Sequence, residues 1–347
     1  MELKKVIIVV SQYNERLSKM QPWYSIKKLS NDFKANDINV EIINSINQIP
    51  YEFSGVVIKV WSLKDIFSKV KNNVNYRLFY LFTFPLYPLS KILDLKYSDI
   101  RKNFDPLKRI ILASLIPKNI IKKNLNKAEN IITISDRSYL YLKKNNIVSI
   151  QYFPFEYDNW GGVELLKNKN KSKKTIGYFG PPYSTRGFVQ CLHFFKFIEE
   201  NNLNYNIKLL TRMEREKLQS VQEKYINTLN IKNIEIVSGF FSRDILKKEL
   251  LDIDFLLLPF KIVMSELPVV VLEALELGIP VITTLEGGVS LLAKNQKNIL
   301  TIERLNSKEF KKVLSFIESN PKDDFNKIKI NINKINTNFL SHIKNYS

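Results

Sequence analysis

A repeated alternation of short apolar runs with amphipathic stretches constrains the fold of this chain more than any other feature. Lys5–Val10 (KVIIVV) is a continuous β-branched run, which is typical of a strand buried on both faces of a parallel sheet. Trp23–Ala35 has helical spacing, and this order of strand and helix predicts an α/β fold with a parallel sheet. The further elements expected in this half are the strands Asn39–Ile43, Val56–Val60, Leu78–Phe82 and Asn130–Ser135 and the helix Arg137–Lys144.

The alternation starts again at Thr175 and predicts a second doubly wound unit. Gln151–Asn170 lies between the two units and is expected to link them. We therefore expect an N-terminal domain over residues 1–160, a second domain over residues 171–318, and a helical tail over residues 319–347 that can cross back to the first domain. Two Rossmann-like, parallel-sheet domains facing a central cleft are a frequent ligand-binding arrangement. The elements expected in the second unit are the strands Thr175–Phe179, Asn206–Leu210, Glu235–Val237, Phe255–Leu258 and Val281–Thr284 and the helices Phe188–Asn201, Arg215–Leu229, Ser242–Leu251 and Pro268–Leu277.

The composition allows two packed domains and excludes some kinds of site. The chain has 347 residues, 45% of them hydrophobic, and its one cysteine, Cys191, excludes an internal disulfide and a multi-cysteine metal site. The apolar run Val6–Val10 is too short for a signal peptide or a membrane-spanning helix. We therefore expect a cytoplasmic protein whose membrane contact is from the surface, at the inner face of the cell membrane.

Leu256–Thr284 is the segment that says most about function. A predicted strand ends at Pro259, a loop follows, and Pro268 suits the first turn of the next helix because its missing N–H costs nothing there. Gly278 and Pro280 suit the end of that helix. The loop of residues 260–267 therefore lies at the carboxyl end of a strand and leads into a helix N-terminus, a position that binds phosphate oxygens.

Within this segment, Leu272-Glu273-Ala274, Gly278, Pro280 and Val281-Ile282 resemble the signature of the retaining, GT-B-fold glycosyltransferases of family 4. The resemblance implies the GT-B fold, and it implies that Glu273 hydrogen-bonds the ribose hydroxyls of a nucleotide-sugar. For Glu273 taken alone, a solvated or capping glutamate is the alternative.

The family also has an earlier glutamate, which the resemblance places beside the transferred sugar as a catalytic residue. Glu266 and Glu273 are separated by six residues rather than the usual seven, so a strict alignment puts Ser265 in that position. A loop shorter by one residue restores Glu266, and we favour this alignment. Ser265 and Leu267 are expected to contact the donor.

A second stretch supports the resemblance. Ile176–Gly187 (IGYFGPPYSTRG) is similar to the family's strand and glycine loop, followed by a basic residue and glycine that open a helix. The implied donor contacts are Gly180 and Arg186, and Arg186 is also implied to be catalytic because a guanidinium stabilises the departing diphosphate. Pro181 stands where the family often has another basic residue. An exposed residue at a helix start is the alternative for Arg186.

A third stretch, Ile234–Pro259, resembles the family's next strand, glycine loop, helix and strand. It implies that backbone groups around Gly239 and Phe240 meet the base of the donor. Gly287-Gly288 falls where the family has a glycine pair, so the matches together cover about residues 175–295.

The N-terminal half offers no residue to which the resemblance assigns a role. Nine of the ten glycines and both histidines, His193 and His342, lie after residue 160. The glycine that family members often have in the loop after the first strand, and the histidine that many have near the reacting sugar, are therefore absent from this half. His193 is expected to be a helix-packing histidine. Thr83-Phe84-Pro85, after a predicted strand, is expected to mark an acceptor wall.

The N-terminal half does carry a basic and apolar stretch. Lys91–Lys127 contains ten Lys or Arg and three Asp, with apolar residues at helix-like spacing over Leu107–Leu125. Such a mixture is typical of an interfacial membrane helix, and a net charge of +19 also calls for an anionic partner. We expect contact with an anionic membrane surface and no nucleic-acid binding. An ordinary core with a basic rim, or lysines without a specific partner, is the alternative.

Together these features predict a hexosyltransferase-type glycosyltransferase. It would move a sugar from a nucleoside-diphosphate sugar to a lipid-linked or growing glycan acceptor at the cytoplasmic membrane face, in glycan or polysaccharide biosynthesis. The resemblance implies retention of anomeric configuration, no metal, and no cofactor besides the nucleotide-sugar substrate. A nucleotide-sugar 2-epimerase of the same fold and a catalytically silent, membrane-associated partner that binds nucleotide-sugar are the alternatives.

Overall fold

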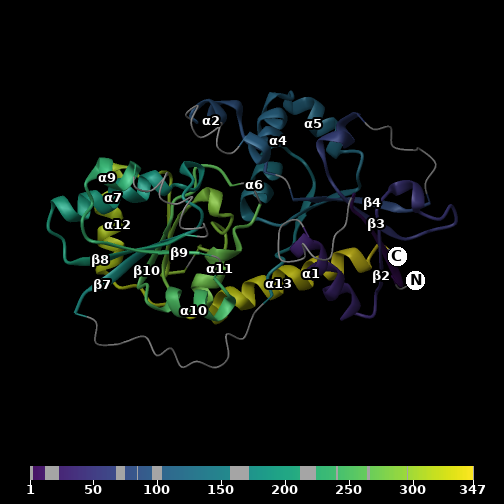
Figure 1. Cartoon of the computed structure of the whole chain (residues 1–347). Coiled ribbons are helices and arrows are strands. Elements are labelled where there is room, and N and C mark those ends of the chain that lie inside the picture. The colour runs from purple at the N-terminus through teal and green to yellow at the C-terminus, as the bar shows by residue number, and fades with distance from the viewer. Residues whose placement is uncertain are drawn as a thin grey trace. The chain divides into compact units, whose positions relative to one another are not determined.

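The computed structural model describes residues 3–11, 23–67, 75–83, 85–95, 104–156, 172–211, 224–239, 241–263, 266–294 and 296–346. The chain divides into two compact units (Figure 1). Unit 1 comprises Met1–Glu156, Met264–Leu267 and Lys327–Ser347, and unit 2 comprises Tyr157–Val263 and Pro268–Asn326. Each unit contains one six-stranded sheet in which the paired strands are parallel, as the alternation of strand and helix predicts.

The sheet of unit 1 has the strand order β2-β1-β3-β4-β5-β6. Its central strands are buried on both faces because β-branched residues fill consecutive positions, and Ile8 of β1 lies between Ile42 of β2 and Ile58 of β3. The strand order reverses between β1 and β3, which makes that point the topological switch point of this sheet. The strands are β1 (Lys5–Val9), β2 (Asn39–Ile43), β3 (Val56–Val60), β4 (Arg77–Phe82), β5 (Asn130–Thr133) and β6 (Ser149–Gln151).

Helices cover both faces of this sheet. One face carries α1 and the C-terminal helix α13, whose Phe33 and Phe339 rings lie 6.0 Å apart in one apolar core (Figure 1). The other face carries Ile121 and Leu125 of α5 and Leu142 of α6. The helices of this unit are α1 (Trp23–Lys34), α2 (Leu89–Leu93), α4 (Phe104–Leu115), α5 (Lys118–Leu125), α6 (Asp136–Lys144) and α13 (Phe325–Lys344), with short 3₁₀ turns at Ile46–Gln48 and Leu63–Phe67.

The sheet of unit 2 has the strand order β12-β11-β10-β7-β8-β9. This is the order of a doubly wound dinucleotide-binding sheet, and its switch point lies between β7 and β10. Ligands of such sheets bind beyond the carboxyl ends of the strands at that point. The strands are β7 (Lys174–Phe179), β8 (Tyr205–Thr211), β9 (Ile234–Ser238), β10 (Phe255–Leu258), β11 (Val281–Thr284) and β12 (Ile299–Ile302).

The helices of unit 2 enclose an aromatic core. Phe194 of α7 meets Phe310 of α12 edge to face, with 5.1 Å between ring centroids, and Cys191 is buried in the same core. The helix expected over Arg215–Leu229 is described only as Lys224–Leu229, because residues 212–223 lie outside the described part of the chain. The helices are α7 (Phe188–Glu200), α9 (Lys224–Leu229), α10 (Arg243–Leu251), α11 (Val269–Glu276) and α12 (Ser307–Glu318).

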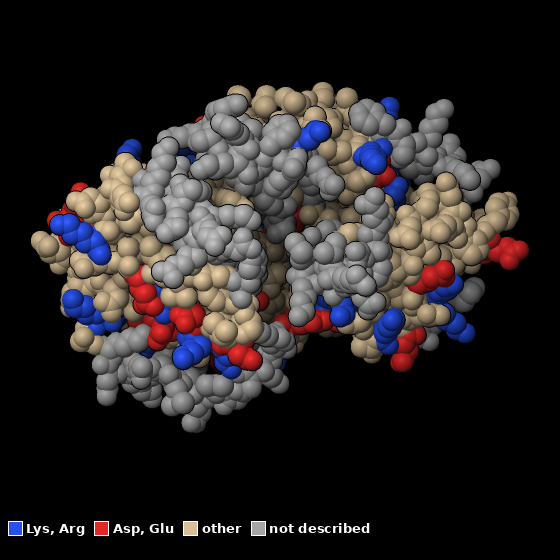
Figure 2. Space-filling model, viewed as in Figure 1, with Lys and Arg blue, Asp and Glu red and all other residues tan. Residues whose placement is uncertain are grey.

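The charged side chains are interspersed on the face that Figure 2 presents. Lysines and arginines lie among aspartates and glutamates over the described surface there, so this face has no single basic field. Among the residues that the structure describes, no helix has both the length and the apolar character needed to cross a membrane.

Candidate functional site

Two loops meet at the switch point of unit 2. One follows β7 (residues 180–187) and the other follows β10 (residues 259–263). The backbone N–H groups of Lys261 and Ile262 donate to the carbonyl oxygen of Thr185 at 2.9 and 3.0 Å. Pro259 packs so closely on Gly187 that a Cβ atom there would lie 2.1 Å from the Pro259 oxygen. Gly187 also has φ +80°, so only glycine lets the loops pack in this way.

Arg186 lies at the meeting point of these loops. It ends the short turn Ser184–Arg186, is half-buried, and has its Cζ atom 5.3 Å from the centroid of the Phe260 ring. A Cβ atom on Gly180, which has φ +143°, would lie 3.4 Å from Nη1 of Arg186. The predicted residues Gly180 and Arg186 are therefore brought together, with a cation held over an aromatic face.

Tyr178 stabilises the loop that carries Gly180 and Arg186. Its hydroxyl donates to the carbonyl oxygen of Pro181 at 2.7 Å and its ring packs on Phe188 with a centroid distance of 5.5 Å. Burial raises the pKa of Tyr178 far above its usual range, although the nearby Arg186 acts in the opposite direction. The phenol therefore stays neutral and keeps donating to the loop.

The helices that begin at this switch point lack side-chain caps. α7 begins after Gly187 and α11 begins after Pro268, and neither residue makes a side-chain cap hydrogen bond. Elsewhere in unit 2, Ser242 caps α10 and Asn306 caps α12. The N–H of Phe188, the first residue of α7, donates to the carbonyl oxygen of Tyr183 at 3.4 Å. A helix N-terminus without a side-chain cap is a position that favours an anion.

Glu273 lies in the second turn of α11, between the buried Leu272 and Ala274, and is itself half-buried. Its backbone carbonyl accepts from the N–H of Leu277. The helix and its end at Gly278, with φ +66°, agree with the sequence prediction. The predicted bond of the Glu273 carboxylate to ribose stays a prediction.

Gly239 directly follows β9, and its N–H donates to the carbonyl oxygen of Thr211 at 3.1 Å. Its φ is +145°, and among the described residues no heavy atom lies within 4 Å of the position that a Cβ would take. Within the described part of the chain, the backbone at this carboxyl edge therefore has open space beside it. Phe240 and Ser265, both predicted donor contacts, lie outside the described residues.

Glu266 lies in a different environment. Its carboxylate is fully buried within unit 1, where the Ser135 hydroxyl donates to Oε2 at 2.5 Å and the Ser138 hydroxyl donates to the same oxygen. Nη1 of Arg137 lies 3.4 Å from Oε1. Leu267, also in unit 1, is buried. The predicted contacts of Glu266 and Leu267 with the donor stay predictions. The predicted acceptor wall at residues 83–85 also stays a prediction, since Phe84 lies outside the described residues.

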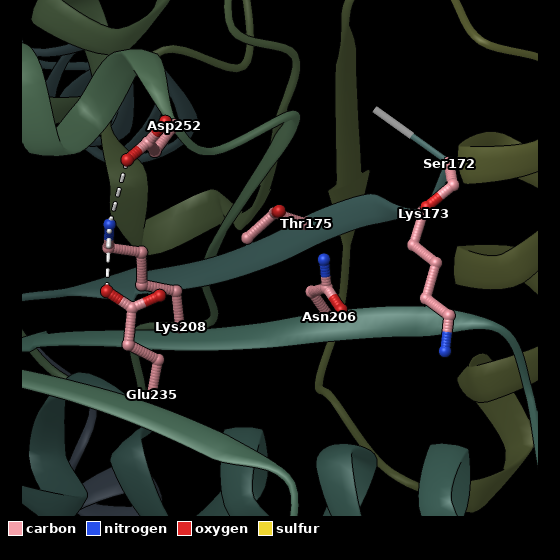
Figure 3. A pocket seen from close by; sticks show the side chains of 7 residues that line it. All are labelled: Ser172, Lys173, Thr175, Asn206, Lys208, Glu235 and Asp252. Atoms are coloured by element: carbon pink, nitrogen blue, oxygen red, sulfur yellow. Dashed lines mark hydrogen bonds and ion pairs between the residues drawn. The ribbon is translucent and has the colours of Figure 1, made fainter. Parts of the chain in front are cut away.

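A polar cavity of about 410 Å³ lies away from this crevice, near the amino ends of β7, β8 and β9 (Figure 3). Lys208 is only 3% exposed there and pairs with Glu249 at 2.8 Å, Glu235 at 3.1 Å and Asp252 at 3.2 Å. Burial alone would lower the pKa of Lys208, but the hydrogen bonds to these three carboxylates outweigh it and raise the pKa. None of the predicted donor residues lines this cavity, which is lined by Ser172, Lys173, Thr175, Asn206, Lys208, Glu235 and Asp252.

Sequence reasoning missed Lys261 and Thr185. Thr185 is buried, and its carbonyl oxygen accepts hydrogen bonds from the other loop. No local sequence pattern predicts this contact. Lys261 could have been found, since it is the basic residue of the loop after β10 and stands two residues from the strand end at Pro259. Among the described residues, no group of three or more His, Cys, Asp or Glu is placed to hold a metal ion.

The C-terminal half matches a known family. Residues 166–334, just under half of the chain, match the family model described as "Glycosyl transferases group 1". Comparison with curated protein sequences gives no match. The family match supports a hexosyltransferase that uses a nucleotide-sugar, which agrees with the predicted enzyme class.

Solved structures similar to this chain extend the comparison to both units. An E. coli protein described as "Trehalose-6-phosphate from E. coli bound with UDP-2-fluoro glucose" has a TM-score of 0.63 at 10% identity, covering 98% of this chain and 99% of that chain. Sucrose-phosphate synthase from Thermosynechococcus elongatus has a TM-score of 0.61 at 10% identity, with 98% and 95% covered. A glycosyltransferase from Rickettsia africae ESF-5 has a TM-score of 0.57 at 12% identity, with 100% and 99% covered. At these identities the likeness shows the fold, and it confirms the predicted GT-B class.

Proposed function

We propose that this chain is a nucleotide-sugar glycosyltransferase whose donor binds at the switch point between β7 and β10. One observation carries the proposal: Arg186 lies where the two loops are locked together, beside Gly180, at the edge from which α7 and α11 start without side-chain caps. A cation and two helix N-termini at one edge favour a diphosphate.

The diphosphate is the group on which this site acts. In the transfer, the bond between the anomeric carbon and the diphosphate oxygen breaks, the acceptor hydroxyl oxygen bonds to that carbon, and the hydroxyl proton passes to the departing diphosphate oxygen. The departing nucleoside diphosphate gains negative charge. Arg186 and the N–H groups of α7 and α11 stabilise that charge, so Arg186 fills the role that a divalent cation fills in other transferases.

Lys261 is the candidate for a second phosphate contact. The family often places a basic residue after the strand glycine, where this chain has Pro181. Lys261 supplies a cation from the neighbouring loop, and its backbone bonds to Thr185, next to Arg186. A diphosphate with two negative charges is bound better by two cations than by one.

For the ribose, the base and the transferred sugar of the donor, we propose the contacts that the resemblance to family 4 implies. Glu273 would accept the ribose hydroxyls, the open backbone at Gly239 would meet the base together with Phe240, and Ser265, Glu266 and Leu267 would lie along the transferred sugar. Retention of anomeric configuration belongs to the same proposal, and no cofactor besides the nucleotide-sugar is needed.

The acceptor side is proposed to work at an anionic membrane surface. On α4, Lys108, Leu112 and Leu115 follow at helical spacing and share an exposed face, with Leu112 46% and Leu115 59% exposed. Leu93 at the end of α2 is 74% exposed. Apolar side chains mixed with lysines on exposed helix faces suit the interface of an anionic leaflet, where each lysine adds about 1 kcal/mol. A lipid-linked acceptor would be presented at such a surface.

Transfer can be tested by following sugar release from a panel of UDP- and GDP-sugars with a membrane lipid extract as acceptor. We expect turnover by the wild type, and losses of about 100-fold or more for Arg186→Ala and Glu273→Ala. Arg304→Ala and Glu303→Ala, which change exposed residues of the same unit, serve as matched controls and should keep wild-type turnover.

Undiminished transfer by both Arg186→Ala and Glu273→Ala would refute the donor site. An epimer formed from the donor without any acceptor would assign the chain to the nucleotide-sugar 2-epimerases instead. Tight donor binding with no turnover on any lipid extract would favour the catalytically silent partner.

Membrane binding can be tested separately by sedimentation with vesicles. We expect the wild type to bind vesicles rich in phosphatidylserine and the double variant Leu112→Glu with Leu115→Glu to lose that binding. Ile330→Glu, which changes an exposed apolar residue of α13 instead, is the control and should bind as the wild type does. Equal binding by all three proteins would contradict the proposed surface.

A further inference from the structure

Three neighbouring strands of unit 2 end beside Arg186. The strand β10, which is labelled in Figure 1, pairs with β7 on one side and with β11 on the other. The loop after β7 carries Arg186, the loop after β10 carries Phe260, and β11 ends with Thr283 and Thr284. The contacts that β11 makes with the loop after β10 therefore bear on the place of Arg186.

Thr284 bonds to the loop after β10 and not to the turn that it precedes. It is the N-cap of the short turn Leu285–Gly287, where a threonine side chain ordinarily accepts from a backbone N–H, but it makes no such bond. Its hydroxyl instead donates to the carbonyl oxygen of Phe260 at 2.8 Å. The hydroxyl of Thr283 donates to the carbonyl oxygen of Leu258 at 3.0 Å, so β11 holds this loop at two points.

The ring of Phe260 lies against the guanidinium of Arg186. Phe260 is only 2% exposed, so close packing restricts where its ring can lie. The Cζ atom of Arg186 is 5.3 Å from the ring centroid, which is within the range of a cation–π contact. A ring face, unlike a carboxylate, carries no net charge. The contact therefore orients the guanidinium and leaves its positive charge for an anionic ligand.

The backbones of the two loops are joined next to this contact. The N–H groups of Lys261 and Ile262 donate to the carbonyl oxygen of Thr185 at 2.9 and 3.0 Å. Lys261 directly follows Phe260, and Thr185 directly precedes Arg186. A shift of the Phe260 backbone therefore reaches Arg186 by two routes, through the ring and through these hydrogen bonds.

We propose that Thr284 and Phe260 are positioning residues for the diphosphate contact of Arg186. Thr284 fixes the backbone of Phe260, and the Phe260 ring holds the guanidinium in place before the nucleotide arrives. This inference rests on the proposed function, because it takes Arg186 to bind the diphosphate. Order present before binding spares the ligand the cost of ordering the arginine side chain, which appears as tighter binding.

Thr284→Val is the cleanest test, because valine keeps the branched shape of threonine and lacks the hydroxyl that bonds to Phe260. We expect a rise of about fivefold or more in the Kd for UDP or GDP, whichever the wild type binds, measured by ligand-observed NMR. Thr284→Ser keeps the hydroxyl and should restore binding to within about twofold. Thr301→Val on β12 is the control and should bind as the wild type does, because the Thr301 hydroxyl has no hydrogen-bond partner among the described residues.

Two comparisons separate the positioning of Arg186 from a general loosening of unit 2. Thr284→Val should keep the Kd for the matching nucleoside, uridine or guanosine, within about twofold of the wild type, because a nucleoside has no phosphate for Arg186 to bind. In the Arg186→Ala background, Thr284→Val should raise the Kd for the nucleoside diphosphate by less than about twofold, because the side chain through which it acts is gone. If Thr284→Val fails to fold, Phe260→Leu should raise the same Kd about fivefold and is put through the same two comparisons.

Unchanged affinity for the nucleoside diphosphate in both Thr284→Val and Phe260→Leu would overturn the inference while the proposed function stands. An equal loss of affinity for the nucleoside, or an equal loss in the Arg186→Ala background, would also overturn it, since either result means that these residues do not act through Arg186. No binding of UDP, GDP or their sugars by the wild type would refute the proposed function itself, and the inference with it.

Discussion

Replacing Gly187 by alanine should disrupt the proposed donor site from within. The new Cβ atom would lie 2.1 Å from the Pro259 oxygen and 2.7 Å from the Pro259 carbonyl carbon, in a backbone with φ +80°. Contacts below 3.0 Å are essentially never seen for a Cβ atom, so the two loops must separate by about 1 Å. The left-handed backbone costs an L-residue about 1–2 kcal/mol, and the crowding adds about 1–3 kcal/mol. We expect the free energy of unfolding of unit 2 to fall by about 2–5 kcal/mol.

The same displacement moves Arg186, which is adjacent in the chain. A misplacement of about 1 Å in a catalytic constellation can cost about 100-fold in rate, so a fall of that order in kcat/KM is expected. Urea denaturation and donor turnover measure the two effects. Gly288→Ala tests the backbone cost separately, because Gly288 has a similar backbone (φ +71°, ψ 13°) but lies outside these two loops. Wild-type stability and turnover in Gly187→Ala would refute the loop packing.

Three further predictions concern single side chains of unit 2. Lys208→Met should lower the free energy of unfolding by about 1–3 kcal/mol in chemical denaturation, because it leaves three carboxylates without their cation although two of them are half exposed or more. Since the folded pKa of Lys208 is raised above 10.5, its contribution should be complete at neutral pH and be lost only as the pH rises through that raised value; a wild-type contribution that falls between pH 6 and 8 would contradict this. Lys261→Met should weaken UDP or GDP binding about tenfold by calorimetry, Lys261→Arg should restore it, and equal affinity in the two variants would rule out a phosphate contact. Cys191 is buried and its burial raises the pKa of the thiol, so it should react with a thiol reagent only after denaturant is added; rapid reaction of the native protein would show that its core is open.

The strands that frame the candidate site could be predicted because their signal is local. The runs TIGYF of β7 and FLLL of β10 are buried, and each carries its own apolar pattern. The helix α13 was predictable in the same way, since Ile328 and Ile332 recur at helical spacing and are buried. The resemblance also placed Gly180 and Arg186, which the structure brings together.

Other features depend on partners far away in the sequence. β6 consists of three half-buried residues, and β12 consists of two buried and two half-buried residues. These strands are therefore recognised by their pairing with β5 and β11 and not by their own composition. The helix α12 has an asparagine N-cap at Asn306. The strand before it has no clear apolar pattern, so the sequence alone does not show that a strand and helix pair stands here.

Glu266 is the sharpest case. Its hydroxyl partners stand 128 and 131 positions away in the chain, on a helix whose sequence reads as an ordinary capped surface helix. Neither the sequence around Glu266 nor the sequence around Ser135 and Ser138 predicts that these side chains bond to each other. The sequence identifies the loop that matters, whereas the contact that holds it is a property of the folded unit.

The central claim is that Arg186 binds the diphosphate of a nucleotide-sugar, and the most direct test is thermal denaturation of the wild type and Arg186→Ala with UDP, GDP and their sugars. The account predicts that one of these ligands stabilises the wild type by about 2.7 kcal/mol at 100 times its Kd. Arg186→Ala should fold as the wild type does and show little of that stabilisation at the same ligand concentration. Equal stabilisation of both proteins, or none in the wild type, would contradict the account.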